Sequence, residues 1–371
     1  MGPDILVVGA GPAGLASATA AAQSGAGVVL TDGASWAGGR LALQTQPLQG
    51  PRSIFGGLSG VDFCRRLVDE ASTAGVDIRL GARVVTIDRS SDGAFVAALA
   101  GGKAKLRPRS VVVATGSNEP RFAFPGSDLP GVMLSGDAQE MLNIRGRLPG
   151  QRIAMVGSDN AGLLISQNLL DAGAVIVAVV EEASEVVGRR INWQPLQARG
   201  VQILTSAKVL TASGAGRLEL MTLRDAACGV RQIDIDVMCL AGPRIPSIEV
   251  VLPTGIAVGE HDALGGLVPV HSRRMGTSIP GLYVCGDSSG VENGAAALES
   301  GRIAGLSAAR DLGYQHPRAR ELLARAGGRL GYLRRGRRGG LRRLAKNALA
   351  AEQRGLSHRQ VRGIDGKLRD S

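Results

Sequence analysis

Short apolar runs alternate with longer runs of small residues over most of this chain. The first apolar run begins at Ile5 and ends in a glycine-rich turn, a run of mostly small residues follows, and a second β-branched run closes at Asp32. A short continuous apolar run is typical of a buried strand, and a longer run of small residues after a turn favours a helix. The pattern therefore predicts strand, tight turn, helix and strand, which is a βαβ unit.

The same pattern occurs a second time. The stretch Ile5–Leu15 (ILVVGAGPAGL) matches Ile153–Leu163 (IAMVGSDNAGL) at an offset of 148 residues, and the match continues to Gly25 and Gly173. The second copy also runs into a β-branched segment, VIVAVVEE, that ends in acidic residues. An internal repeat of one supersecondary unit predicts two similar domains. We therefore expect an α/β protein with two Rossmann-like domains.

The first copy carries the complete pattern Gly-x-Gly-x-x-Gly at Gly9, Gly11 and Gly14. The first glycine permits the sharp turn, the second lets the backbone approach a pyrophosphate, and the third lets helix and strand pack closely. The helix N-terminus offers N–H groups and a partial positive charge to the phosphates. Asp32 follows Gly9 by 23 residues, where a carboxylate can accept hydrogen bonds from a ribose. These residues predict a dinucleotide site.

Three further motifs follow in order: GGR at 38–40, VVVATGS at 111–117 and TSIPGLYVCGD at 277–287. Together with the first motif they resemble the two-dinucleotide-binding flavoproteins, the superfamily of glutathione reductase and thioredoxin reductase, from about residue 4 to residue 314. The resemblance implies FAD at the first site, with Asp32 on its ribose. It assigns to the same FAD site Gly9, Gly11, Gly14, Gly39, Arg40, Ala114, Thr115, Gly116, Gly286, Asp287 and Asn293. A helix beginning near Asn293 would point its positive end at the flavin, and Asn293 is also a suitable N-cap residue.

The resemblance also implies the order of the domains. An FAD-binding domain of residues 1–120 and 245–315 would be interrupted by an NAD(P)-binding-like domain of residues 121–244. A basic, helical C-terminal tail of residues 316–371 would follow. The expected fold is thus α/β, with two Rossmann-like domains and a helical tail.

Three stretches narrow the likeness further: GGRLALQTQP, MVGSDNAGLLISQNLLDAGAVIVAVVE and GDSSGVENGAAALESGRIAG. They resemble the FAD-containing subunits of opine oxidase, hydroxyproline dehydrogenase and hydrogen cyanide synthase, and a region of heterotetrameric sarcosine oxidase, which lack the redox-active CxxC pair. This likeness implies an amine or imino-acid substrate and an oligomer or a complex with a partner subunit. Several such proteins add a cysteine-rich iron–sulfur module. This chain has no cysteine after Cys285, so a cluster would lie on the partner.

The composition agrees with a globular protein, because 44% of the 371 residues are hydrophobic. No apolar run reaches membrane-spanning length without glycine or charge, and the N-terminus enters a strand at once, so we expect a cytoplasmic protein. The four cysteines lie far apart without a CxxC pair, which argues against a zinc site, an iron–sulfur cluster and a disulfide relay. We expect Cys285 to be a buried strand residue and His271 to be a core or surface residue rather than a catalytic base. We expect no metal site.

The net charge of +11 belongs to the tail alone. Residues 317–371 hold 16 of the 43 Lys and Arg residues and 4 of the 32 Asp and Glu residues, which leaves 27 basic against 28 acidic residues elsewhere. Such a tail could touch anionic lipid, RNA or an acidic partner, although its lone aromatic residue, Tyr332, disfavours nucleic acid. The alternative is a helix that docks on the body through Leu341, Leu344, Ala345 and Leu349, which recur at helical spacing.

The segment that follows the GGR motif is too rich in Gln, Gly and Pro for a plain helix. It could run past the flavin ring or form a surface loop between two helices. In the first case its polar side chains Arg40, Gln44 and Gln46 are the candidates to lie near the flavin. A flavin performs the redox chemistry itself, and the protein supplies binding, orientation and electrostatics. No catalytic base can be assigned from spacing.

The second glycine loop departs from the pattern, because Asp159 stands where Gly11 stands in the first. Its side chain would fill the space of a pyrophosphate, and its charge would repel the phosphates by ~1–4 kcal/mol at about 4 Å. Alternatively, Asp159 or Asn160 caps the helix. If NAD(H) binds, Gly157 and Gly162 would hold it, and Glu181 would favour the free ribose of NAD. Arg189 and Arg190 leave NADP as the alternative.

The sequence thus predicts an FAD-dependent oxidoreductase without a CxxC disulfide relay, in which hydride passes between an amine or imino-acid substrate and flavin N5, in a subunit of a larger complex. Two alternatives stay open. One is an NADH-dependent flavin reductase, which requires a competent second loop. The other is a non-catalytic FAD-binding scaffold that docks a catalytic partner through its tail.

Overall fold

A computed structural model of the protein describes residues 2–102 and 104–367, which form two compact units. The first unit comprises Met1–Asn118 and Ile245–Ser371, and the second comprises Glu119–Arg244. The predicted α/β fold with two Rossmann-like domains and a helical C-terminal segment is confirmed.

The first unit is built on a five-stranded parallel sheet in the order β20-β7-β1-β2-β3. Its strands are β1 (Ile5–Val8), β2 (Val28–Thr31), β3 (Asp77–Arg79), β7 (Ser110–Val113) and β20 (Leu282–Val284). Every residue of β1 is buried, because both faces of the sheet are covered. Ile5 and Val7 pack against helices, and Leu6 and Val8 pack on the opposite side against antiparallel strands.

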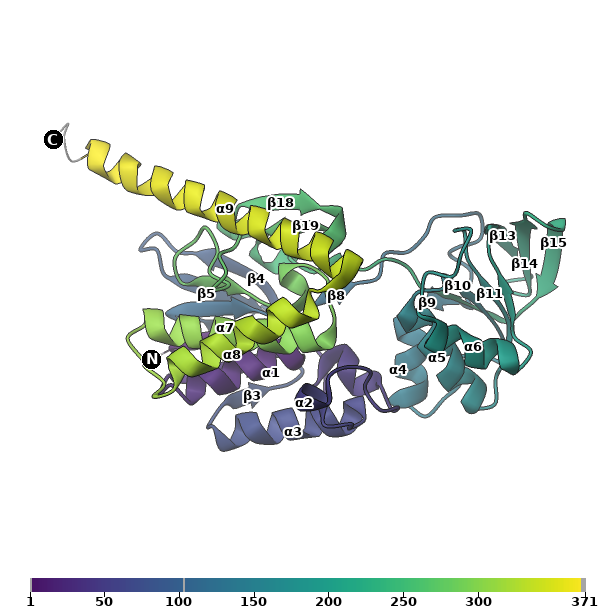
Figure 1. Ribbon diagram of the computed structural model, residues 1–371, viewed down its shortest axis with the longest axis horizontal. Coiled ribbons are helices and arrows are strands. Elements are labelled where there is room, and N and C mark those ends of the chain that lie inside the picture. Colours follow the sequence, from purple (N-terminus) through teal and green to yellow (C-terminus); the bar gives the residue numbers. More distant parts are fainter. Residues whose placement is uncertain (1, 103, 368–371) are drawn as a thin grey trace. The chain divides into compact units, whose positions relative to one another are not determined.

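Two helices of the first unit approach each other closely. They are α1 (Pro12–Ala22) and α7 (Gly294–Asp311), which lie side by side in Figure 1. A Cβ added to Gly301 would lie 2.1 Å from the Ala13 carbonyl oxygen, and one added to Gly305 would lie 2.1 Å from that of Ser17. The close approach of the two backbones therefore requires glycine at positions 301 and 305 of α7. Each helix starts after the carboxyl end of its strand, so both N-termini lie at one edge of the sheet.

The remaining elements of the first unit surround this core. The helices are α2 (Arg52–Phe55), α3 (Gly60–Thr73), α8 (Ala319–Leu333) and α9 (Gly336–Lys367), with 3₁₀ turns η1 (Gly39–Leu43), η2 (Glu249–Thr254), η3 (Asp262–Leu264) and η4 (Gly286–Ser289). The strands are β4 (Val84–Arg89), β5 (Phe95–Leu99), β6 (Lys105–Leu106), β8 (Ser117–Asn118), β17 (Ile245–Pro246), β18 (Val258–His261) and β19 (Gly266–Pro269).

The second unit has a five-stranded parallel sheet in the order β12-β11-β10-β16-β9. Its strands are β9 (Val132–Leu134), β10 (Arg152–Val156), β11 (Val175–Val180), β12 (Gln202–Leu204) and β16 (Val237–Leu240). Its other elements are helices α4 (Ser135–Asn143), α5 (Asn160–Asp171) and α6 (Arg190–Ala198) and the antiparallel strands β13 (Ala207–Ser213), β14 (Leu220–Asp225) and β15 (Gly229–Asp234).

The internal repeat extends well beyond the stretch that is visible in the sequence. Strands β1, β2, β3 and β7 correspond to β10, β11, β12 and β16 in both chain order and sheet order. Each unit also inserts three antiparallel strands before its last equivalent strand, β4 to β6 in the first and β13 to β15 in the second. The duplication therefore covers four of the five strands of each sheet with their connections, rather than one βαβ unit.

The C-terminal helices dock on the first unit, but not through all the residues that the sequence suggested. Leu349 is fully buried against the β18–β19 hairpin, and Ala345 is partly buried beside it. Leu341 and Leu344 are instead 53% and 64% exposed, so their predicted docking role is wrong. The segment is helical, as its spacing predicts. Its buried side, however, is formed by Lys346, Leu349 and Ala350, one residue later in the chain than the predicted pair Ala345 and Leu349.

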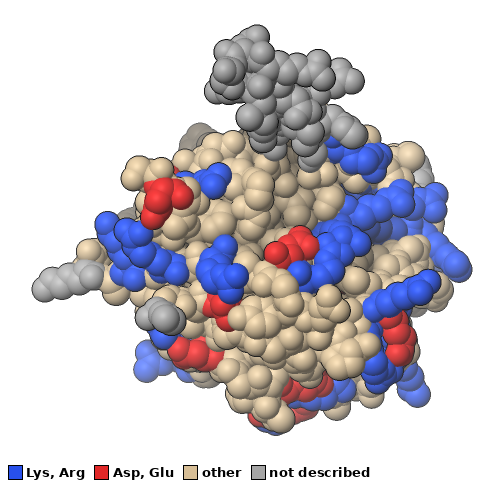
Figure 2. All heavy atoms as spheres, turned by 90° about the vertical axis from the view of Figure 1, so that its left-hand side faces the viewer, with Lys and Arg blue, Asp and Glu red and all other residues tan. Residues whose placement is uncertain are grey.

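The basic residues do not merge into one surface on the face shown in Figure 2. Their side chains form several groups, the largest on the right-hand side of the view, and acidic side chains lie beside them. Within the ranges that the structure describes, each helix is too short or too polar to span a bilayer.

Candidate functional site

The first glycine loop connects β1 to α1, and each of its three glycines answers a different requirement. Gly9 has φ +107°, and a Cβ there would lie 2.3 Å from the Ala114 carbonyl oxygen. A Cβ on Gly14 would lie 1.7 Å from the Gly9 carbonyl oxygen. A Cβ on Gly11 would meet nothing within 4 Å. Protein packing therefore requires Gly9 and Gly14, whereas Gly11 leaves open space in front of the helix.

The N-terminus of α1 has no side-chain cap. Its N-cap residue is Gly11, and Pro12 occupies the first helical turn, where its missing N–H costs no hydrogen bond. The first N–H groups of a helix have no partner within the helix. With open space before them, they form the kind of anion site that the glycine pattern predicted.

Asp32 is held at this loop by two backbone N–H groups. Its Oδ2 accepts from the N–H of Ala10 at 2.6 Å, and its Oδ1 accepts from that of Ala34 at 2.8 Å. The GGR motif also reaches the loop, because the N–H of Gly38 donates to the Ala10 carbonyl at 2.7 Å. A Cβ on Gly39 would lie 3.1 Å from the Cα of Gly11. The structure thus brings Asp32, the carboxylate predicted to bind the ribose, and the GGR motif to the glycine loop.

The other two predicted FAD motifs meet the same loop. Gly9 lies against the backbone of Ala114 and Thr115, and a Cβ on Gly286 would lie 2.8 Å from the Cβ of Ala13. The Thr115 hydroxyl donates to the Ser247 carbonyl, next to Gly116. These contacts join three distant chain segments at one edge of the first sheet.

Asp287 and Asn293 shape the segment between β20 and α7. Asp287 accepts from the Ser117 hydroxyl at 2.8 Å through Oδ2 and from the Glu292 N–H at 3.1 Å through Oδ1. Asn293 is the N-cap of α7, and its side chain accepts from the N–H of Ala296 at 2.9 Å. The capping role considered for Asn293 is confirmed. Whether Asn293 also touches a flavin stays a prediction.

Arg40, Gln44 and Gln46 lie in the segment that follows the GGR motif. Arg40 is part of the turn η1, Gln44 ends that turn, and Gln46 follows in an irregular stretch before α2. All three are half-buried. The segment is therefore not a plain helix, and the assignment of these side chains to the flavin stays a prediction.

The second glycine loop keeps the first and third glycines of the pattern and has Asp159 in place of the second. Gly157 has φ +101°, and a Cβ there would lie 1.7 Å from the Ala241 carbonyl oxygen, while one on Gly162 would lie 2.7 Å from the Ala241 Cβ. Asp159 is the N-cap of α5, and its Oδ1 accepts from the N–H of Gly162 at 2.8 Å. The capping alternative for Asp159 is confirmed. Asn160 does not cap; its Oδ1 accepts from the Arg189 N–H and the Asn192 side-chain amide.

Glu181 is held in the same way as Asp32. It accepts from the N–H of Ser158 at 2.9 Å and from the N–H of Ala183 at 2.9 Å, and also from the Ser158 hydroxyl at 2.6 Å. The N–H of Gly188 donates to the Ser158 carbonyl at 2.8 Å, as that of Gly38 does to Ala10. The repeat is therefore preserved in its hydrogen bonds as well as in its topology.

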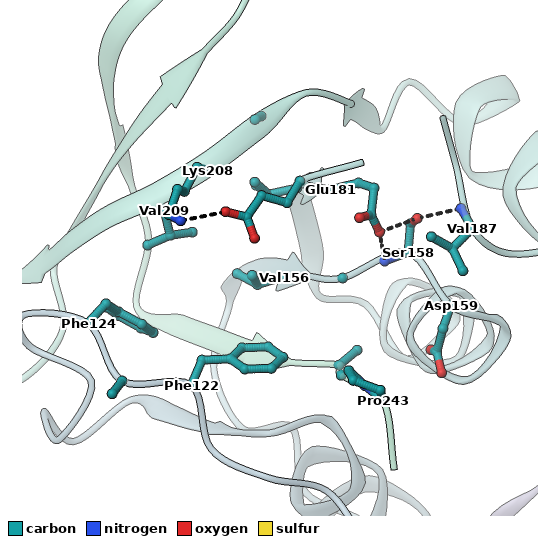
Figure 3. Close-up of a pocket in the computed structure, with 17 residues that line it drawn as sticks. Phe122, Phe124, Val156, Ser158, Asp159, Glu181, Val187, Lys208, Val209 and Pro243 are labelled. Atoms are coloured by element: carbon teal, nitrogen blue, oxygen red, sulfur yellow. Dashed lines mark hydrogen bonds and ion pairs between the residues drawn. The ribbon is translucent and has the colours of Figure 1, made fainter. Parts of the chain in front are cut away.

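A cavity of about 470 Å³ opens beside this second loop (Figure 3). Its lining combines apolar and aromatic side chains, including Phe122 and Phe124, with three carboxylates, Asp159, Glu181 and Glu182. The one lining cation among the described residues, Lys208, pairs with Glu182 at 2.7 Å. The cavity thus holds excess negative charge, which opposes a pyrophosphate.

The cysteines offer no redox pair. All four are free thiols, and Cys64, Cys239 and Cys285 are buried, as expected for Cys285. Burial raises the pKa of the Cys285 thiol to about 12, so it is not a nucleophile at neutral pH. Within the part of the chain that the structure describes, no group of three or more His, Cys, Asp and Glu side chains could hold a metal ion.

One charged cluster near α7 was missed by the sequence reasoning. Arg334 donates to both oxygens of Glu292 at 2.8 and 2.7 Å, and Lys346 is buried against Ser289 and His271. Burial lowers the pKa of His271 to about 3, so this residue is a neutral core histidine. The sequence carried no signal for this cluster, because Lys346 lies 57 residues from Ser289 and 75 residues from His271.

Comparisons with known proteins agree with this geometry. The pattern of the pyridine nucleotide-disulphide oxidoreductases matches residues 3–311. One of the subunits of the opine oxidase of Agrobacterium tumefaciens is 29% identical over 333 residues, which cover 83% of this chain and 66% of that protein. The alpha subunit of the sarcosine oxidase of Rhizobium meliloti is 27% identical over 85% of this chain and 31% of that protein. The chain therefore spans less than two thirds of the length of these relatives.

The fold has solved counterparts. The crystal structure of T. acidophilum thioredoxin reductase superimposes with a TM-score of 0.71 at 23% identity, over 84% of this chain and 98% of that one. The predicted likeness to two-dinucleotide-binding flavoproteins is confirmed, and proteins of this family bind FAD and NAD(P)H. The chain belongs to the pyridine nucleotide-disulphide oxidoreductase family.

Proposed function

We propose that this chain is the FAD-binding subunit of a complex that oxidises amines or imino acids. The observation that carries the proposal is the contrast between the two glycine loops. In the first, α1 is uncapped and Gly11 leaves open space, whereas in the second Asp159 already occupies the helix N-terminus. Of the two glycine loops, the first thus offers an open anion site of the dinucleotide type.

The residues of the first site fit FAD. The uncapped N-terminus of α1 would hold the pyrophosphate, and Asp32 would accept hydrogen bonds from the adenosine ribose. Gly39 and Arg40 lie at or beside the loop, and Asp287 would hold the ribityl and phosphate region. The predicted roles of Ala114, Thr115, Gly116 and Gly286 are to shape the backbone around the cofactor.

When bound, FAD supplies a hydride acceptor, and oxidation of a C–H bond beside an amine nitrogen to an imine is the reaction class that we propose. The chain's own part is electrostatic. The N-terminus of α7 presents its partial positive charge to the site and so favours the negative charge that a reduced flavin carries. Arg40, Gln44 and Gln46 remain the proposed polar contacts near the reacting end.

Two relatives support the substrate class and the complex. Their names describe subunits of an opine oxidase and a sarcosine oxidase, and both opines and sarcosine are secondary amines. The absence of a CxxC pair from the sequence removes the disulfide relay that the family name implies. Electrons would therefore leave through a partner subunit or a small acceptor.

A second candidate is an NADH-dependent flavin reductase. The observation in its favour is Glu181, which is held as Asp32 is, beside a cavity of about 470 Å³. The cap and the charge of Asp159 weigh against it.

Anaerobic visible spectroscopy of the purified protein separates these functions. The proposal predicts a yellow protein whose flavin is bleached by a secondary amine such as sarcosine, an opine or a cyclic imino acid, alone or with its partner subunit. Bleaching by NADH alone would favour the flavin reductase. If the protein binds FAD but neither the amines nor NADH reduce the flavin, even with the partner subunit present, the chain is a non-catalytic FAD-binding scaffold. If the protein takes up no FAD, the proposal is refuted.

A further inference from the structure

The C-terminal helices bring two cations to the segment Gly286–Asn293. This segment carries two carboxylates, Asp287 and Glu292, and the cations are Arg334, at the end of α8, and Lys346, on α9. Arg334 pairs with Glu292 through two hydrogen bonds, and the two side chains are only 13% and 8% exposed. Opposite charges thus meet in equal number where the tail touches a predicted FAD motif.

Lys346 is satisfied as a protonated amine. Its Nζ lies within hydrogen-bonding distance of three acceptors: the Ser289 carbonyl, the Ser289 hydroxyl at 3.0 Å and His271 Nε2 at 3.3 Å. His271 Nδ1 faces the Pro269 carbonyl at 2.7 Å and must donate to it, so Nε2 accepts. An ammonium group has three donors, and here each has its own acceptor.

A buried lysine is costly unless it is paired. Burial is the main cause that lowers the pKa of Lys346 to about 7. Arg334 acts in the same direction, and Glu292, Asp287 and Cys285 act in the opposite direction. Burial alone would raise the pKa of Glu292, but the hydrogen bonds from Arg334 and the charge of Lys346 lower it on balance. The carboxylates of the segment thus counteract the effect of burial on Lys346, and Arg334 and Lys346 counteract it on Glu292.

The contacts of Lys346 continue to Asp287. The Ser289 hydroxyl donates to the Gly286 carbonyl at 2.8 Å, and the N–H of Gly290 donates to the Asp287 carbonyl at 2.9 Å. From the other side, Arg334 holds Glu292, whose N–H donates to Asp287 Oδ1. The tail thus contacts the segment on both sides of Asp287, through Arg334 at Glu292 and through Lys346 at Ser289.

The position of Lys346 depends on the apolar packing of α9 on the first unit. Leu349 packs on Leu264 and Val268, and the Leu264 carbonyl accepts from the N–H of Val291, within the segment Gly286–Asn293. The exposed side of the helix carries Arg343. Lys346 therefore faces the segment, whereas Arg343 faces solvent.

We propose that the C-terminal helices are part of the FAD site, with Lys346 as a positioning residue that, together with Arg334, fixes the segment Gly286–Asn293 in its FAD-binding conformation. This inference rests on the proposed function, because it takes Asp287 to be an FAD contact. It assigns the basic tail an internal role in cofactor binding, in place of a role as a free arm for lipid or RNA.

The test compares Lys346→Met with Arg343→Met, a basic residue on the exposed side of the same helix. Folding is checked by circular dichroism and melting temperature, FAD affinity by equilibrium titration of the apoprotein, and the midpoint potential of the bound flavin by anaerobic reductive titration. Lys346→Met should weaken FAD binding about tenfold or more, which corresponds to about 1.4 kcal/mol. At about pH 6, below the lowered pKa of Lys346, it should also make the potential more negative, since a positive charge stabilises the reduced flavin. Arg343→Met should change neither.

Glu292→Gln provides a second test if Lys346→Met does not fold, because it keeps the size of the side chain and one hydrogen bond to Arg334. It should weaken FAD binding about fivefold, or about 1 kcal/mol. Wild-type affinity and potential in a folded variant would overturn the inference, as would an affinity loss that only follows the melting temperature at unchanged potential. If the wild-type protein itself took up no FAD, the proposed function would fail, and the inference with it.

Discussion

Replacing Asp159 should restore nicotinamide binding to the second unit. In the wild-type protein its carboxylate caps α5 at 2.8 Å from the Gly162 nitrogen, where a phosphate oxygen would otherwise accept that N–H. Asp159→Asn keeps a capping oxygen and removes the charge. Asp159→Gly also removes the side chain and gives the second loop the glycine that the first loop has.

The size of the effect follows from the charge. One carboxylate and one phosphate charge about 4 Å apart repel by ~1 kcal/mol in water and by ~4 kcal/mol near a protein surface. Asp159 is half-exposed, so the value lies between these limits. Asp159→Asn should therefore tighten NADH binding between about fivefold and about a thousandfold. Asp159→Gly should gain at least as much, because a glycine N-cap costs the helix only a few tenths of a kcal/mol.

The assay is titration of the purified protein with NADH, followed by anaerobic stopped-flow measurement of flavin bleaching. Asp171→Asn is the matched control, since it removes the same charge from the last residue of the same helix. That residue lies about 17 Å along the helix, beyond the Debye length of about 8 Å, and its loss should leave NADH affinity unchanged. If neither Asp159 variant binds NADH more tightly than the wild type, the carboxylate is not the obstacle and the reasoning is wrong.

Three further predictions concern the first unit. Gly11→Ala should weaken FAD binding but leave the melting temperature of the apoprotein unchanged, because its Cβ meets open space in the protein. Gly14→Ala should unfold or strongly destabilise the apoprotein, since its Cβ would lie 1.7 Å from a carbonyl oxygen, and equal effects of the two variants on stability would contradict this. Leu349→Ala should cost about 2–5 kcal/mol in urea unfolding, and Leu344→Ala, at a 64% exposed site, within about 0.5 kcal/mol. Burial lowers the pKa of Lys346 to about 7, so between pH 7 and its ordinary 10.5 the unfolded chain binds the proton that the folded chain has released. Stability should therefore rise with pH across this window, by at most about 1.4 kcal/mol per pH unit. Urea titrations of Lys346→Met should lack this contribution, and an unchanged slope would refute the assignment.

The parts that local pattern determines were predictable. The residues around Gly9 and Gly157 specify strand, turn and helix within a few positions, and the acid at the end of the next strand follows from the same geometry. Sequence could not decide whether Asp159 or Asn160 caps α5, since both residue types favour that position. The structure decides it because Asn160 is engaged with the turn that leads into α6.

The cluster around Lys346 lay beyond prediction for a different reason. Lys346 is separated from Ser289 by 57 residues and from His271 by 75, and no periodicity connects them. In a segment with many basic residues, each cation has the same appearance in the sequence. Only packing shows that Lys346 and Arg334 turn inward while Arg343 stays in solvent.

The unequal caps of the two glycine loops have a consequence for how the chain responds to nucleotide supply. Helix α5 carries its own anion in Asp159 and is complete without a ligand, whereas α1 begins at a glycine and depends on a bound phosphate to satisfy its first N–H groups. By mass action a ligand stabilises only the folded form that binds it. Scarcity of FAD would therefore lower the resistance of the first unit to unfolding and proteolysis, while the second unit would keep its stability whatever the nucleotide level of the cell.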